Sequence, residues 1–91
     1  MPKVIVTAEI ENAEKWEKGF RSHGDLFKSQ TVTNTSFQVT EDNKVAACFE
    51  VSDLDTYMKI FKSPRTAEAM AYDGIKKETV QVFVLDKQYT P

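Results

Sequence analysis

The sequence predicts an α+β domain in which four strands alternate with two helical segments. Stretches with an apolar side chain at every second position, typical of strands, occur near both ends of the chain and in its middle. Stretches with apolar side chains three and four positions apart, typical of helices, separate them. The chain has 91 residues, and we expect one domain to cover residues 1–91.

The first strand is expected over residues 3–11, where apolar and polar side chains alternate. Asn12 then offers a helix N-cap, and the apolar spacing changes to that of a helix. Gly24 can end or bend this helix, because it lacks a side chain. The large side chains that share one face of a continuous helix are Trp16, Phe20, His23 and Phe27.

A hairpin is expected to follow the first helix. Residues 31–40 are β-branched and polar, which predicts an edge strand, and residues 45–51 predict its partner across a turn. Ser52, with Asp55 three residues later, resembles a capping box and is expected to open the next helix. The apolar stripe of that helix consists of Leu54, Tyr57, Met58 and Phe61.

The second helical segment is expected to break once. Ser63 can cap a new helix, and Pro64 suits its first position, where no amide hydrogen is needed. Gly74 supplies the C-terminal stop, and residues 77–86 predict the last strand. The side chains expected to face inward from this helix are Ala67, Met70 and Ala71.

The resulting order, βαββαβ, is that of a ferredoxin-like fold, with helices on one face of a four-stranded antiparallel sheet. The first and third strands then lie side by side in the centre. The face beneath the helices is expected to carry Val4, Val6, Ala8, Ile10, Val45, Ala47, Phe49 and Val51.

The opposite sheet face is too apolar for a face in water, which is normally polar. Its apolar members are Ile5, Ala46, Cys48, Phe83 and Leu85. This composition predicts contact with a second copy of the chain, with an unusual monomer surface as the alternative. A chain of this size buries only about 60–65% of its unfolded surface, so a dimer would add to a small core.

Composition excludes several classes of protein. The 12 basic and 14 acidic residues give a net charge of -2, without the basic face that nucleic-acid binding requires. Cys48 is the only cysteine, which excludes an intrachain disulfide, and we expect a small buried residue rather than a reactive thiol. The sequence shows no metal motif, phosphate cradle, signal peptide or membrane-spanning run. We therefore expect a cytoplasmic protein with neither metal nor cofactor, and no membrane partner.

The chain resembles the dimeric α+β barrel superfamily, which includes antibiotic-biosynthesis monooxygenases. The resemblance rests on the βαββαβ order, on Trp16 and Phe20 as a W-x3-F pair, on "VSDLDTYMKIFKSP" (51–64) and on "AEAMAYDGI" (67–75). It implies a homodimer whose sheets pair into a barrel, and a pocket in each subunit between its helices and its sheet. Members include cofactor-free oxygenases, haem-degrading enzymes and enzymes that act on small organic acids or polyketides. The haem-degrading pattern, an asparagine on the first strand and a histidine on the second helix, is missing here.

The implied pocket agrees with the small side chains of Ala8 and Ala47 beneath large ones, although helices packed closer to the sheet would fill the same space. Its polar groups would be His23 and Tyr57, with Arg21 or Tyr72 as further candidates. The side chains expected to contact a ligand are Trp16, Phe20, His23, Phe49, Tyr57, Met58, Phe61 and Met70. Both methionines suit core packing equally well.

His23 is the candidate catalytic residue, because a histidine can donate or accept a proton near neutral pH. No orienting partner is visible by spacing, since Asp25 faces elsewhere on a continuous helix. His23 can therefore be a proton carrier, a ligand contact or an ordinary core histidine. Two functions follow: a homodimeric protein that binds a fatty-acid-like or polyketide-like molecule, or a cofactor-free monooxygenase-type enzyme.

Overall fold

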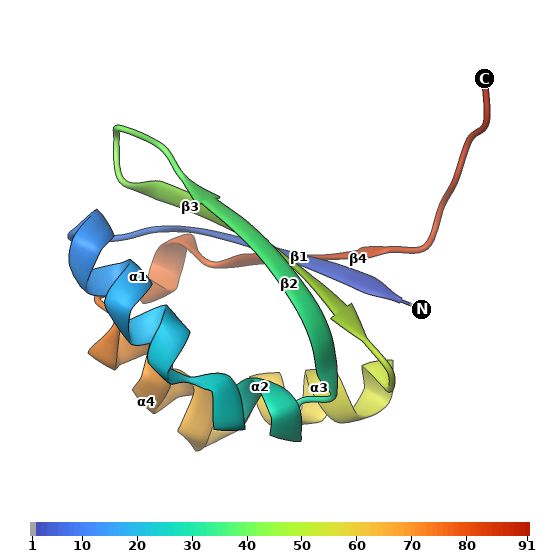
Figure 1. Cartoon of the computed structure of the whole chain (residues 1–91), viewed down its shortest axis with the longest axis horizontal. Helices are drawn as coiled ribbons and strands as arrows, with labels where there is room; N and C mark the ends of the chain where they lie inside the picture. Colours follow the sequence, from blue (N-terminus) through green and yellow to red (C-terminus); the bar gives the residue numbers. More distant parts are fainter. Residues whose placement is uncertain (1) are drawn as a thin grey trace.

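A computed structural model describes residues 2–91. Its elements are β1 (Lys3–Glu9), α1 (Ala13–Ser22), α2 (Gly24–Ser29), β2 (Val32–Val39), β3 (Lys44–Val51), α3 (Leu54–Phe61), α4 (Pro64–Tyr72), a 3-10 turn (Lys77–Thr79) and β4 (Gln81–Leu85). Figure 1 shows all the helices on one face of the sheet, with the other face bare.

The sheet has the strand order β2-β3-β1-β4, and every neighbouring pair is antiparallel. This confirms the ferredoxin-like topology, the central place of the first and third strands and the edge position of the second. The first strand is shorter than predicted. Beyond Glu9 only Ile10 pairs, in an isolated bridge with Ile75.

The first helical segment is two helices, α1 and α2, which meet at the position where an end or bend was expected. Asn12 caps α1 as expected, with its side-chain oxygen accepting the Lys15 N–H at 2.9 Å. The His23 N–H then bonds back to the Phe20 carbonyl, which ends α1, and α2 begins at Gly24. The bend expected at Gly24 is confirmed, and His23 stands at the junction of the two helices.

The N-cap of α3 also differs from the prediction. Asp53, not Ser52, caps the helix, because its carboxylate accepts both the backbone N–H and the hydroxyl of Thr56. Ser52 instead bonds to the loop after α2, because its backbone N–H and its hydroxyl both donate to the Thr31 carbonyl.

Around α4, the predicted ends are confirmed, and the predicted inward face is right for Met70 and wrong for the two alanines. Ser63 occupies the N-cap, Pro64 opens the helix, and Gly74 follows it with a φ of 75°. Ala67 and Ala71 are exposed, whereas the buried or half-buried positions are Thr66, Ala69, Met70 and Asp73. The predicted last strand loses residues 77–79 to the 3-10 turn, so β4 is short.

An aromatic core joins the helices to the sheet. Trp16 stacks on Phe20 with ring centroids 4.7 Å apart, and Phe20 packs against Phe37 of β2 at 4.9 Å. The predicted inner sheet face is confirmed, with Val6 only half-buried. The buried apolar residues are Val4, Ala8, Ile10, Trp16, Phe20, Leu26, Val45, Ala47, Phe49, Val51 and Tyr57.

Apolar side chains on β4 remain exposed. Phe83 and Leu85 pair with Ile5 and Lys3 across the sheet and are each 48% exposed. They alternate along β4 with Val82, which packs against the core beneath the helices, so they lie on the opposite sheet face. Within residues 2–91, no helix is both long and apolar enough to cross a bilayer.

Candidate functional site

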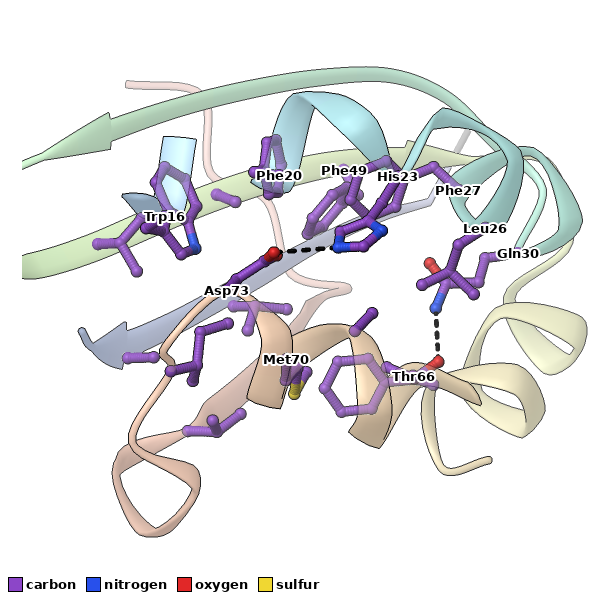
Figure 2. A pocket seen from close by; sticks show the side chains of 18 of the residues that line it. Trp16, Phe20, His23, Leu26, Phe27, Gln30, Phe49, Thr66, Met70 and Asp73 are labelled. Carbon is purple, nitrogen blue, oxygen red and sulfur yellow. Dashed lines mark hydrogen bonds and ion pairs between the residues drawn. The ribbon is translucent and has the colours of Figure 1, made fainter. Parts of the chain in front are cut away.

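A cavity of about 70 Å³ lies between the helices and the sheet. Ala8 and Ala47 form part of its floor, and side chains from all four helices form its walls (Figure 2). Its volume accommodates roughly two water molecules at about 30 Å³ each, and is about half of the ~150 Å³ that holds benzene in a protein core. In this conformation the cavity therefore accepts a very small molecule or one end of a larger one.

Most of the predicted contact residues line this cavity: Trp16, Phe20, His23, Phe49, Tyr57, Phe61 and Met70. Met58 does not line it and packs against the core instead. Neither Arg21 nor Tyr72 lines it. Arg21 pairs with Glu17 on the surface at 2.9 Å, and Tyr72 is 69% exposed, with its ring edge-on to His23.

His23 has an orienting partner that the sequence did not reveal. Its Nε2 lies 3.0 Å from Oδ1 of Asp73, the residue that ends α4, fifty positions further along the chain. The side chains are 21% and 5% exposed, so the pair is largely shielded from water. Asp25, the only partner considered from spacing, lies on α2 and is exposed.

The surroundings of Asp73 influence its protonation. Burial raises the pKa of Asp73, while the hydrogen bond and charge of His23 lower it, and burial is the larger effect. When Asp73 is ionised, Nε2–H of His23 donates to it and Nδ1 is free to accept. When Asp73 is protonated, its O–H donates to Nε2 and Nδ1 carries the hydrogen. Nδ1, which points away from Asp73 in Figure 2, can therefore offer either role to a neighbouring molecule.

Gly19 makes this pairing possible. A Cβ at this position would overlap Oδ1 of Asp73 and lie 2.8 Å from its Cγ, far inside ordinary contact. The residue on the buried face of α1 one turn before His23 must therefore have no side chain. A glycine in the interior of a helix, four positions before a histidine, is the sequence signal that could have indicated this contact.

A second buried polar pair lies in the cavity wall. Gln30 and Thr66 are 2% and 4% exposed, and Gln30 Nε2 donates to Thr66 Oγ1 at 3.1 Å. Thr66 Oγ1 in turn donates to the Ile60 carbonyl at 2.6 Å. The spacing of both residues could have indicated their place in the site. Gln30 is seven positions after His23, and Thr66 is seven positions before Asp73. Residues seven positions apart lie on the same face of a helix.

Tyr57 contributes a neutral hydroxyl. Burial raises the pKa of its phenol well above the ordinary value, so the group stays protonated near neutral pH and cannot act as a base. In the part of the chain that the structure describes, no group of three or more His, Cys, Asp or Glu side chains could hold a metal ion.

No protein-family model matches the chain, and no curated protein sequence does. Solved structures do. A Bordetella bronchiseptica protein, provisionally named an antibiotic biosynthesis monooxygenase, is similar with a TM-score of 0.74 and 14% identity over 97% of each chain. The chain has the fold of the antibiotic biosynthesis monooxygenases.

SnoaB, a cofactor-independent oxygenase from Streptomyces nogalater, is similar with a TM-score of 0.72 and 12% identity, over 98% of this chain and 94% of SnoaB. The At3g17210 protein of Arabidopsis thaliana has a TM-score of 0.71 and 10% identity, over 100% of this chain and 99% of the plant protein. These matches confirm the fold of the dimeric α+β barrel proteins along nearly the whole chain.

Proposed function

We propose that the protein is a homodimeric small-molecule-binding protein, whose cavity takes an apolar or amphipathic molecule with its polar group at His23. The observation that carries this proposal is the His23–Asp73 pair in the wall of a largely apolar cavity. Apolar walls with a few placed polar groups are typical of small-molecule sites. Asp73 fixes the imidazole ring, so Nδ1 is held in place for a ligand.

The size of the cavity limits how a larger ligand binds. About 70 Å³ does not accommodate a whole fatty-acid-like chain or polyketide-like ring system, so such a ligand requires the wall to move. Phe27, Phe61 and Met70 are half-buried in that wall, and a methionine adapts readily to new shapes. The side of the cavity formed by α2, α3 and α4 is therefore the part that would open.

The bare sheet face supports the homodimer. Phe83 and Leu85 expose about half of their surface there, and Cys48 and Ile5 add half-buried apolar area beside them. A second copy packed on this face would cover these side chains, as in the barrel that the resemblance implies. The cavity lies on the opposite side of the sheet, so both subunits would keep their cavities.

The binding proposal is tested by filling the cavity. Ala47→Leu adds three carbon atoms to the floor, whereas Ala67→Leu makes the same change on the exposed side of α4. We expect Ala47→Leu to weaken the binding of 1-hexanol and 1-naphthol about tenfold or more, measured by ligand-observed NMR. Ala67→Leu should bind both probes like the wild type. Equal binding by the two variants would contradict the proposal.

The same pair favours a second candidate function, a cofactor-free monooxygenase-type enzyme in which His23 carries a proton. A histidine held by a buried carboxylate is suited to general acid–base catalysis, and the similar fold of SnoaB supports this candidate. His23→Ala separates the two functions. An enzyme should lose about 100-fold or more in turnover of its substrate. A binding protein should lose only about 5- to 30-fold in affinity, the effect of one hydrogen bond.

A further inference from the structure

The indole of Trp16 carries a buried hydrogen-bond donor without a partner. Trp16 is 1% exposed, and within residues 2–91 its Nε1 has no hydrogen-bond partner. A buried tryptophan normally finds an acceptor for its N–H, because leaving the donor unpaired is costly. The ring forms part of the cavity wall, but the nitrogen itself is fully buried, so a ligand acceptor reaches the N–H only when the wall shifts around the indole.

The position of the ring is fixed by its neighbours. It stacks on Phe20 and meets the edge of Phe37, with ring centroids 4.7 Å and 5.5 Å away. Figure 2 shows its nitrogen turned toward the interior of the cavity, on the side of Asp73. Among the described residues, the other buried unpaired side-chain atom is Thr35 Oγ1, which does not line the cavity. Trp16 Nε1 is therefore the orphan group that a cavity ligand can satisfy.

The chemistry of the wall limits what that ligand can be. An indole N–H only donates, so its partner must be an acceptor. No lysine or arginine lines the cavity, and burial already raises the pKa of Asp73 there. His23, the basic side chain of the wall, is already paired with Asp73, so an anionic oxygen would enter without a free counter-ion, at a high desolvation cost. A neutral carbonyl oxygen accepts the hydrogen bond without this cost.

We propose that Trp16 Nε1–H binds a neutral carbonyl oxygen of the ligand, so that the cavity selects small neutral ketones over hydrocarbons and carboxylates. This inference rests on the binding function proposed above and narrows its ligand class. His23 and the Gln30–Thr66 pair remain available for other polar groups of the same molecule.

The test uses two probes of nearly equal shape, cyclopentanone and methylenecyclopentane, in which an exocyclic CH₂ replaces the oxygen. The chain has a single tryptophan, so the ¹⁵N-labelled protein gives one indole N–H resonance, an unambiguous reporter of Nε1. We expect the ketone to bind about tenfold or more tightly than the alkene, the effect of one hydrogen bond to a buried donor. Only the ketone should move the indole proton downfield.

Two further outcomes separate this inference from the proposed function. If both probes perturb the cavity resonances with equal affinity and leave the indole proton unmoved, the carbonyl selection is overturned and the cavity function stands. If neither probe perturbs the cavity resonances, both proposals fail.

A variant adds an independent check. Trp16→Phe keeps an aromatic ring and removes the N–H, so the preference for the ketone over the alkene should disappear. Phe37→Leu is the matched control, because it disturbs the packing of the Trp16 ring from outside the cavity and removes no polar atom. It should change the affinity for both probes alike. A preference that survives in Trp16→Phe would overturn the inference, and the wild-type titration decides the matter if this variant does not fold.

Discussion

Gly19→Ala is the substitution that most sharply tests the His23–Asp73 pair. In an ordinary helix interior, alanine stabilises by about 1 kcal/mol relative to glycine. Here the added Cβ would overlap Oδ1 of Asp73, and Cγ would lie 0.6 Å inside the 3.4 Å at which ordinary contact begins. Asp73 is 4% exposed and ends α4, so it has little room to withdraw.

The cost can be estimated from the two ways in which the clash can relax. Overpacking a well-packed site costs about 1–3 kcal/mol, and losing a hydrogen bond that involves a charged group costs about 1.5–3 kcal/mol. The gain of about 1 kcal/mol in helix propensity offsets part of either cost. We therefore expect Gly19→Ala to lower the free energy of unfolding by about 0.5–2 kcal/mol.

Urea unfolding followed by the fluorescence of Trp16 measures this change, with Gly24→Ala as the control because nothing lies within 4 Å of a Cβ there. The decisive experiment repeats Gly19→Ala in an Asp73→Ala background. The nearest atom that remains is the Cα of residue 73, at an ordinary 3.6 Å, so alanine should now stabilise by up to about 1 kcal/mol. A destabilisation of equal size in both backgrounds would refute the reasoning.

Three further predictions follow from the same structure. Because burial raises the pKa of Asp73 above its ordinary 3.8, the folded protein binds this proton at a higher pH than the unfolded chain. The free energy of unfolding of the wild type, relative to that of Asp73→Asn, should therefore rise as the pH falls through the raised pKa, and should level off below 3.8. Urea titrations from about pH 7 to 3 measure this difference. A decrease of the difference on acidification would contradict the prediction. Asn12→Ala should cost about 1 kcal/mol through its lost cap bond, whereas Lys18→Ala, at an exposed position of the same helix, should cost clearly less; equal losses would contradict the assignment. Phe83→Lys should convert a dimer into a monomer in light scattering while Tyr72→Lys, on the helical side, should not, and an unchanged mass for both would count against the sheet interface.

The sequence was sufficient to predict the fold because the fold depends on local patterns. Alternating apolar residues located the strands, and Asn12, Pro64 and Gly74 located helix ends, all of which the structure confirms. The wrong N-cap assignment arose where a polar side chain had two possible hydrogen-bond partners. Ser52 resembled a cap, but its hydroxyl bonds to the Thr31 carbonyl and leaves the capping role to Asp53.

The site was less predictable, because its polar members lie on helix faces that were expected to be apolar. On α4, small alanines were assigned to the interior, yet the polar Thr66 and Asp73 are buried there. Their burial depends on partners far away in the sequence, Gln30 and His23, which only the tertiary structure brings close. His23 itself was predictable, since it shares its spacing with buried aromatic residues.

Native mass spectrometry of the purified protein tests directly whether the protein is a dimer whose cavities bind a small molecule. It would be run before and after incubation with a mixture of small ketones, phenols and short fatty acids, followed by denaturing extraction, on the wild type and on Ala47→Leu. We expect the wild type to be a dimer that retains one small organic molecule per subunit, and Ala47→Leu to be a dimer that retains none. A wild-type protein that stays bare after incubation, or a filled-cavity variant that carries the same molecules, would contradict this expectation.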